Sequence, residues 1–157
     1  MVDQLDLDIL ERLNEDGRAS MRQVASEVDA SPSTVSNRVK ELRNSGVIAG
    51  FRPVIDYDRL GYNLTSITQI RTEAGMQDAV AEDLAERGFV TSLYQVTGDK
   101  DIIVIARFRG RRELKENLVQ DLNKMDGVKN TNTNVVLESE TENRPVSLEP
   151  LEAENLP

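Results

Sequence analysis

The sequence predicts an α+β protein with an N-terminal winged helix-turn-helix domain of three helices and a C-terminal ferredoxin-like βαββαβ domain. Three observations support this fold class. Two helix-start signals lie close together in the first 50 residues, apolar residues there recur at helical spacing, and strand and helix patterns alternate after residue 63. We expect domains over residues 1–50 and 64–138, a strand and hinge linker over 51–63, and an acidic, disordered tail over 139–157.

The first two helices carry local start and stop signals. The first is expected over residues 3–15, and Gly17 follows its end as a stop signal. The second begins with Ser20, which forms a capping box with Gln23 three residues later. The apolar positions of the first helix, all on one face, are Leu5, Ile9 and Leu13.

The third helix begins at an N-cap, Ser31, followed by Pro32 at the first helical position, where proline's missing N–H costs nothing. Only Asp29 and Ala30 separate it from the second helix, so the chain must turn sharply, as in a helix-turn-helix. Gly46 marks its end. Its apolar stripe consists of Val35, Val39 and Leu42.

The opposite face of the third helix carries small polar and basic side chains. Asn and Ser hydrogen-bond base edges, whereas Lys and Arg neutralise phosphates. Any amphipathic surface helix presents a polar face, but the capped pair and its tight turn favour DNA binding. Arg38 lies near the apolar stripe, so a structural ion pair competes there with a phosphate contact. The candidate DNA-binding residues, led by Asn37 and Lys40, are Ser33, Thr34, Ser36, Asn37, Arg38, Lys40 and Arg43.

The rest of the chain is predicted to form a linker, a domain of strands and helices, and the tail. Val47 to Ile55 is expected to form a wing or hinge strand, which Pro53 restricts to a sheet edge, and 56–63 complete the linker. A sheet covered by helices on one face leaves its other face open, which favours packing against a second copy. The later elements are strands at 64–72, 90–96, 102–106 and 131–137 and helices at 77–86 and from Leu114 to Gly127. A short strand over 144–148 is the alternative to disorder in the tail.

Charge and composition restrict the function. The net charge of −9 divides into −3 for residues 1–50, −1 for 51–137 and −5 for 138–157. With 14 Arg against 5 Lys, the acidic chain resembles proteins of salt-accumulating halophiles, although an ordinary acidic protein is the alternative. At molar salt, counterion release contributes little to DNA affinity, so base contacts, DNA shape and dimer avidity would have to supply it.

The absence of Cys and His excludes several kinds of chemistry. It removes disulfides, thiol catalysis, the usual zinc ligands and histidine acid–base catalysis. We therefore predict no catalytic residue, no metal site and no cofactor. No long apolar run or basic leader is present, so we expect a cytoplasmic protein without membrane contact.

Gly98-Asp99-Lys100-Asp101 lies between two predicted strands. Gly and Asp tolerate the dihedral angles of a tight turn, so a simple hairpin is the favoured interpretation from spacing alone. The paired carboxylates also suggest a magnesium site, but nothing else in the sequence supports one.

Several motifs resemble the Lrp/AsnC (leucine-responsive regulator, feast/famine) transcription factors. They occur in the family's order and cover most of the chain, at Val2–Arg18, Arg38–Ile48, Ile55–Gly61 and Gly98–Asp101. The resemblance implies a sequence-specific regulator that binds double-stranded promoter DNA as a homodimer, tetramer or octamer. It also implies an amino acid or related metabolite as effector at subunit interfaces. Together with the acidic composition, it suggests a halophilic archaeon as the source.

In this family the Gly-Asp loop contributes to the amino-acid site. Asp99 or Asp101 would then receive a ligand ammonium group, and backbone N–H groups near Gly98 its carboxylate. For Tyr94, interface packing is favoured over ligand contact. The candidate effector-binding residues are Tyr94, Thr97, Gly98, Asp99, Asp101, Thr131 and Thr133. Two other classes stay open: a metabolite-binding oligomer without a direct promoter role, and a small enzyme, which the missing His, Cys and phosphate loop disfavour.

Overall fold

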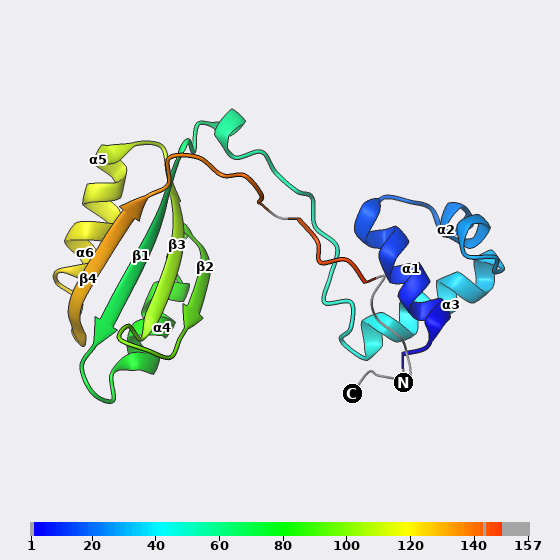
Figure 1. Ribbon diagram of the computed structural model, residues 1–157, viewed down its shortest axis with the longest axis horizontal. Coiled ribbons are helices and arrows are strands. Elements are labelled where there is room, and N and C mark those ends of the chain that lie inside the picture. Colours follow the sequence, from blue (N-terminus) through cyan, green and yellow to red (C-terminus); the bar gives the residue numbers. More distant parts are fainter. Residues whose placement is uncertain (1, 143, 149–157) are drawn as a thin grey trace. The chain divides into compact units, whose positions relative to one another are not determined.

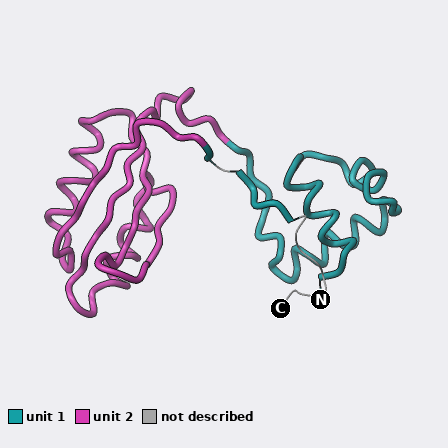
Figure 2. Tube along the Cα trace, in the orientation of Figure 1, with its two compact units in different colours: residues 1–54, 141–157 teal, residues 55–140 magenta. Residues whose placement is uncertain are grey.

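A computed structural model of the chain describes residues 2–142 and 144–148 (Figure 1). The chain divides into two compact units, residues 1–54 with 141–157 and residues 55–140 (Figure 2). The predicted fold class is confirmed, with a helical unit followed by an antiparallel four-stranded sheet. Residues 149–157 of the predicted disordered tail lie outside the described residues.

The N-terminal unit consists of α1 (Gln4–Glu15), α2 (Met21–Glu27) and α3 (Pro32–Asn44). The capping box of Ser20 with Gln23 is present, and Ser31 caps α3 as predicted. Between the two helices Asp29 adopts a left-handed backbone with φ of 50°, which Asp tolerates and which makes the tight turn possible. The core consists of Ile9, Leu13, Val24, Ala25, Val35 and Val39.

The strand predicted over 47–55 is wrong. The structure gives this segment no strand assignment, because no described segment pairs with it, and Pro53 has no N–H to donate. At its start, the Ile48 N–H donates to the Leu42 carbonyl (3.0 Å) and its side chain packs against the helical core.

The linker ends in a turn that is fixed to the second unit. A short 3₁₀ helix, η1 (Asp58–Leu60), closes at Gly61, whose φ is 88°. The guanidinium of Arg107, at the end of β3, lies 5.3 Å from the centre of the Tyr57 ring and 3.5 Å from an Asp58 carboxylate oxygen. Cation–π contact and an ion pair therefore hold this turn against the sheet.

The C-terminal unit follows the predicted βαββαβ order. Its strands are β1 (Leu64–Thr72), β2 (Val90–Gln95), β3 (Ile102–Phe108) and β4 (Val128–Val135), arranged β2-β3-β1-β4 with antiparallel pairing. The helical elements are α4 (Gln77–Ala85) and a continuous stretch of α5 (Arg111–Leu114), a π-helical turn η2 (Lys115–Val119) and α6 (Gln120–Leu122). Both helical stretches cover one face of the sheet (Figure 1).

Three strands differ from prediction in their bounds, β2 only by ending at Gln95. β3 continues to Phe108, and β4 starts at Val128 and ends at Val135, so that Leu137 is 99% exposed beyond it. The helix-covered face carries the buried apolar residues of β3, which are Ile102, Val104, Ala106 and Phe108. By strand alternation, Ile67, Ile103 and Ile105 lie on the other face and are only partly buried.

Candidate DNA-binding and effector-binding sites

The outer face of α3 presents most of the predicted DNA-binding residues to solvent. Its apolar stripe is buried, with Val35 at 0% and Leu42 at 3% exposure. The register of the helix therefore turns the polar positions outward, as its periodicity predicts. The exposed candidates are Ser33, Ser36, Asn37, Lys40 and Arg43, whereas Thr34 and Arg38 are half-buried.

Hydroxyl groups cluster at the start of α3. The Ser31 hydroxyl accepts from the Thr34 N–H at 3.0 Å. Its oxygen also lies 2.7 Å from the Thr34 hydroxyl and 2.8 Å from the Ser33 hydroxyl. Thr34 thus contributes to the cap that begins the helix, while the exposed hydroxyl of Ser33 lies where helix-turn-helix proteins contact bases.

Arg38 joins α3 to the start of α1. One guanidinium nitrogen lies 2.7 Å from an Asp3 carboxylate oxygen and 3.3 Å from one of Asp6, whose side chain is only 6% exposed. The charge of Asp6, followed by that of Asp3, raises the pKa of Arg38. Burial acts to raise the pKa of Asp3, but the Asp6 N–H and Arg38 outweigh it and the pKa is lowered. Arg38 therefore has two structural partners at the start of α1.

Arg22 is one of the exposed cations of this unit that the predicted DNA-binding set does not include. Arg22 lies in the first turn of α2 and is exposed to solvent. In helix-turn-helix proteins the helix before the reader helix crosses the DNA backbone, so this position suits a phosphate contact. The sequence could have indicated this role through the position of Arg22, which follows the capping residue Ser20 and Met21 at the start of the predicted helix.

The Gly98–Asp101 loop is anchored through Asp101. Its carboxylate accepts from the Thr72 N–H (2.7 Å) and from the Thr72 hydroxyl (3.1 Å), and its own N–H donates to the Ile70 carbonyl (2.9 Å). The backbone hydrogen bond from Thr72 is the main reason that the pKa of Asp101 is lowered. Asp101 thus ties the loop to the end of β1.

The other carboxylate of the loop points to solvent. The Asp99 side chain is 88% exposed and its nearest described cation, Lys100, is 4.0 Å away. Gly98 has φ of 121°, a conformation that favours glycine, and Thr97 beside it is exposed. The Asp99 carboxylate is therefore open to solvent, with Lys100 as its partner at 4.0 Å.

The remaining effector-binding candidates divide between the two faces of the sheet. Tyr94 pairs with Ile103 on the face without helices and is 54% exposed. Thr131 pairs with buried Ile70, and the Thr133 hydroxyl lies 3.0 Å from that of buried Thr68. Within one chain, Tyr94 and these threonines thus do not form one site.

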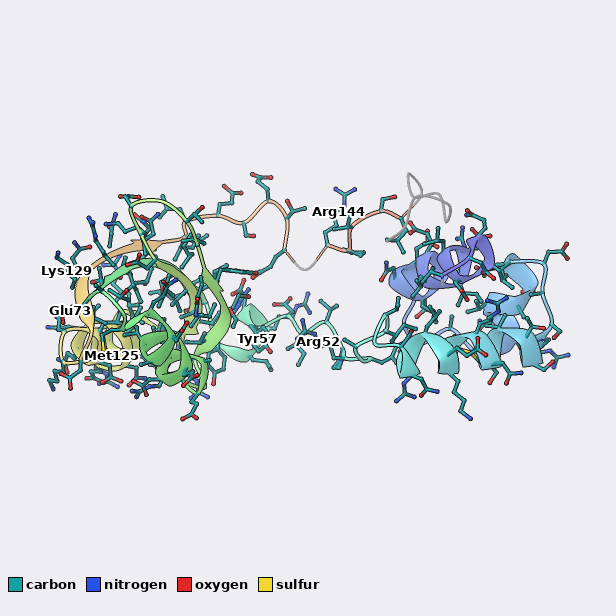
Figure 3. The ribbon with its side chains drawn as sticks, turned by 90° about the horizontal axis from the view of Figure 1, so that it is seen from below. Arg52, Tyr57, Glu73, Met125, Lys129 and Arg144 are labelled. Carbon is teal, nitrogen blue, oxygen red and sulfur yellow. The ribbon has the colours of Figure 1, made fainter. Side chains whose placement is uncertain are left out.

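Residues near the beginning of β4 lie beside the loop, which sequence reasoning missed. The Lys100 ammonium donates to the Asn130 side-chain oxygen at 3.3 Å, and the Glu73 N–H donates to the Gly127 carbonyl at 2.8 Å. Figure 3 shows Glu73, Met125 and Lys129 at this same end of the unit. Only the β1–β4 register brings these segments together, so no local pattern reveals the contact.

Residues 2–142 and 144–148 contain no group of three or more Asp, Glu, His or Cys side chains arranged to hold a metal ion. In the same residues, no helix has the length and apolar character needed to span a membrane.

Comparison with known proteins assigns a family to both units. Residues 2–49 match the profile of the winged helix-turn-helix DNA-binding domain, and residues 65–146 match that of the Lrp/AsnC ligand binding domain. The two matches follow each other in the order of the two structural units.

Individual relatives agree with these matches. An HTH-type transcriptional regulator of Pyrococcus furiosus is 41% identical over 137 residues, 87% of this chain and 92% of that protein. The structure of Escherichia coli AsnC is similar with a TM-score of 0.82 and 26% identity, covering 94% of this chain and 99% of that one. A Neisseria meningitidis regulator in complex with L-Met has the same fold, with a TM-score of 0.89 at 20% identity over 96% of this chain and all of that one (100%). The chain thus belongs to the Lrp/AsnC family of transcriptional regulators and is not an enzyme.

Proposed function

We propose that this regulator binds double-stranded promoter DNA through α3 as a homodimer or larger assembly, and that a small amino-acid-like metabolite controls its assembly. The observation that carries the proposal is the exposed row of Ser33, Asn37 and Lys40 on a capped reader helix. Side chains of these types donate to and accept from base edges or neutralise phosphates. Arg22 and Arg43 supply further cations, while Arg38 orients the helix.

Exposed apolar surface supports self-association. The linker region exposes Phe51 (51%), Val54 (78%) and Leu60 (61%), and the sheet face without helices carries partly buried isoleucines. Apolar surface of this extent is typical of an interface rather than of a monomer. A second copy would cover it and place two reader helices on one duplex, and tetramers or octamers would follow from further interfaces of the same kind.

The Gly98–Asp101 loop is the proposed effector site. Asp99 would accept from the ligand ammonium, and backbone N–H groups beside Gly98 would bind its carboxylate, with Thr97 as a further hydroxyl contact. Asp101 would hold the loop in place rather than contact the ligand with its bonded oxygen. The L-Met complex of a regulator with this fold supports an amino acid as the ligand class.

We also propose a salt-rich cytoplasm as the working environment. The protein is acidic, with a net charge of −9 and 14 Arg against 5 Lys, and the relatives described above include an archaeal one. In such a medium phosphate contacts are screened. The uncharged contacts of α3 and the avidity of an oligomer then contribute a larger share of the DNA affinity.

The test is footprinting on the gene's own promoter, repeated with each amino acid, followed by substitutions on α3. Asn37→Ala should weaken binding to the footprinted site by roughly tenfold with little effect on random DNA, because one base contact is lost. Lys40→Ala should weaken binding to both DNAs equally, because a phosphate contact carries no sequence information.

Three results would contradict the proposal. Equal losses on specific and random DNA for Asn37→Ala would remove its base-reading role. No footprint together with tight amino-acid binding would favour a metabolite-binding oligomer without a direct promoter role. A footprint that no amino acid alters would remove the proposed effector class.

A further inference from the structure

The chain's C-terminal segment returns to the helical unit and contacts α1. The Leu148 N–H donates to a carboxylate oxygen of Glu11 at 2.9 Å. Leu148 is half-buried and lines a groove of about 200 Å³ between α1 and the end of α2. Apolar Leu7 and Val28 line this groove together with the carboxylates of Asp8, Glu11 and Glu27.

Charge attraction does not explain this contact. The groove is acidic, and its one cation, Arg12, is already paired with Glu15 (2.6 Å) and Glu27 (3.7 Å) among the described residues. The tail from residue 138 is itself acidic. The contact instead uses a backbone N–H and an apolar side chain. Such a contact persists in salt, where repulsion between the acidic tail and the acidic groove is screened.

The reader face of α3 stays free when Leu148 is in the groove. None of Ser33, Asn37 and Lys40 lines the groove, and all three are exposed. The tail contact and DNA binding are therefore compatible, and the contact does not block the reader helix.

The helical unit is consequently attached to the sheet unit by two segments of chain. The first runs from Ile48, packed on the helical core, to Tyr57, held by Arg107, and spans at most about 31 Å. The second runs from Val136, whose N–H donates to the Thr65 carbonyl, to Leu148, and spans at most about 41 Å. One tether leaves a domain free to rotate about its attachment, whereas a second tether at a different point restricts that rotation.

We propose that residues 144–148 act as a strap that restrains the helical unit and so limits the range of spacings at which two reader helices of an assembly engage DNA. The strap goes beyond the proposed DNA binding and rests on it. Releasing Leu148 from α1 leaves each reader helix intact but lets it reach half-sites at other spacings.

The first experiment tests whether the strap is bound in the full-length protein. Hydrogen exchange of α1 and of the tail is compared for wild type, Leu148→Asp and the control Val146→Asp, which alters a side chain that is 82% exposed. Leu148→Asp should speed exchange in residues 4–15 and at position 148 roughly tenfold, the effect of losing a hydrogen bond to a charged group. Val146→Asp should exchange like wild type, and unchanged exchange in Leu148→Asp would overturn the contact.

The second experiment tests what the strap does. Binding is measured on a duplex with two half-sites at the natural spacing and on one lengthened by about five base pairs, half a helical turn. For wild type and Val146→Asp, the affinity for the longer duplex should be roughly thirtyfold lower than that for the natural one. For Leu148→Asp the affinity should fall by less than about threefold. All three should bind a single half-site equally, which shows that the reader is folded.

The outcomes separate the strap from the proposed function. If wild type does not bind the half-sites at all, the DNA-binding proposal fails. If wild type binds and Leu148→Asp shows faster exchange but the same thirtyfold spacing penalty, the strap proposal fails while DNA binding stands.

Discussion

At the scale of single residues, Arg38 shows how a cation on a reader helix can serve the fold. It neutralises Asp6, which is nearly buried, and Asp3, which begins α1. Arg38→Ala should lower the free energy of unfolding of the helical unit by clearly more than the control described below, since a poorly solvated carboxylate loses its partner while partial exposure screens the pair. Hydrogen exchange of α1 to α3 measures the change.

Arg43→Ala is the matched control because Arg43 is exposed on the same helix. It should change that free energy by less than about 0.5 kcal/mol. If Arg38→Ala left stability unchanged and weakened binding to all DNA sequences, Arg38 would be a phosphate contact instead.

Asp101 gives a second residue-scale prediction, on acid stability. Hydrogen bonds from Thr72 lower its pKa in the folded protein below the ordinary value of 3.8. Its stabilisation is therefore complete above that value and is lost as the pH falls through the lower folded pKa. Asp101→Asn should remove this contribution, so the stability of the sheet unit should fall less steeply than in wild type below about pH 4.

Melting temperatures between about pH 5 and pH 2 measure this difference. Asp99→Asn is the control, because the Asp99 carboxylate is 88% exposed and has no hydrogen bond among the described contacts. Its pH profile should run parallel to wild type. A parallel profile for Asp101→Asn as well would mean that the Thr72 contact does not anchor the loop.

At the scale of elements, the connection into β4 depends on Gly127. Its φ is 84°, and a Cβ atom there would lie 2.7 Å from the Cβ of Met76, at the start of α4. Gly127→Ala should therefore destabilise the sheet unit by about 2 kcal/mol through both backbone strain and overlap. Denaturant unfolding of the full chain gives the change.

Gly88→Ala provides the comparison, since Gly88 is exposed and a Cβ there would have no atom within 4 Å. It should change the free energy of unfolding of the sheet unit by less than about 0.5 kcal/mol. Equal effects of the two substitutions would show that α4 and the β4 connection separate easily.

The elements that sequence predicts well are those with local signals. The starts of α2 and α3 depend on Ser20 and Ser31, whose partners lie three residues away, and both are confirmed. The strand expected over 47–55 is wrong because a strand needs a partner, which its own residues do not specify. The end of β4 likewise depends on its pairing with β1.

The same holds for the site residues: a local pattern predicts their position, whereas a contact between distant parts of the chain is not predicted. Periodicity alone turns Asn37 and Lys40 outward, and the structure agrees. The ion pairs of Arg38 and the Thr72 contact of Asp101 join positions far apart in the chain, so no local pattern reveals them. The strand register also places Thr133 and Tyr94 on different sheet faces, although both had been grouped by family resemblance.

At the scale of the whole molecule, charge opposes the proposed function. Residues 1–50 carry −3 overall, and the favourable cations are a few side chains on α2 and α3. Affinity must then come from a small number of phosphate contacts, from uncharged base contacts and from the joining of two readers in one assembly.

This balance predicts a shallow dependence of DNA binding on salt. If Arg22, Lys40 and Arg43 of two subunits each contact one phosphate, log K should fall with log [KCl] with a slope of roughly −5, against about −10 for a strongly basic repressor. Lys40→Ala removes one contact from each subunit, so the slope should become shallower by about 2. Arg112→Ala, an exposed arginine of the sheet unit, should leave the slope unchanged. Titrations between about 0.1 and 1 M KCl measure all three slopes, and a wild-type slope near −10 would mean that cations outside α2 and α3 also bind the DNA.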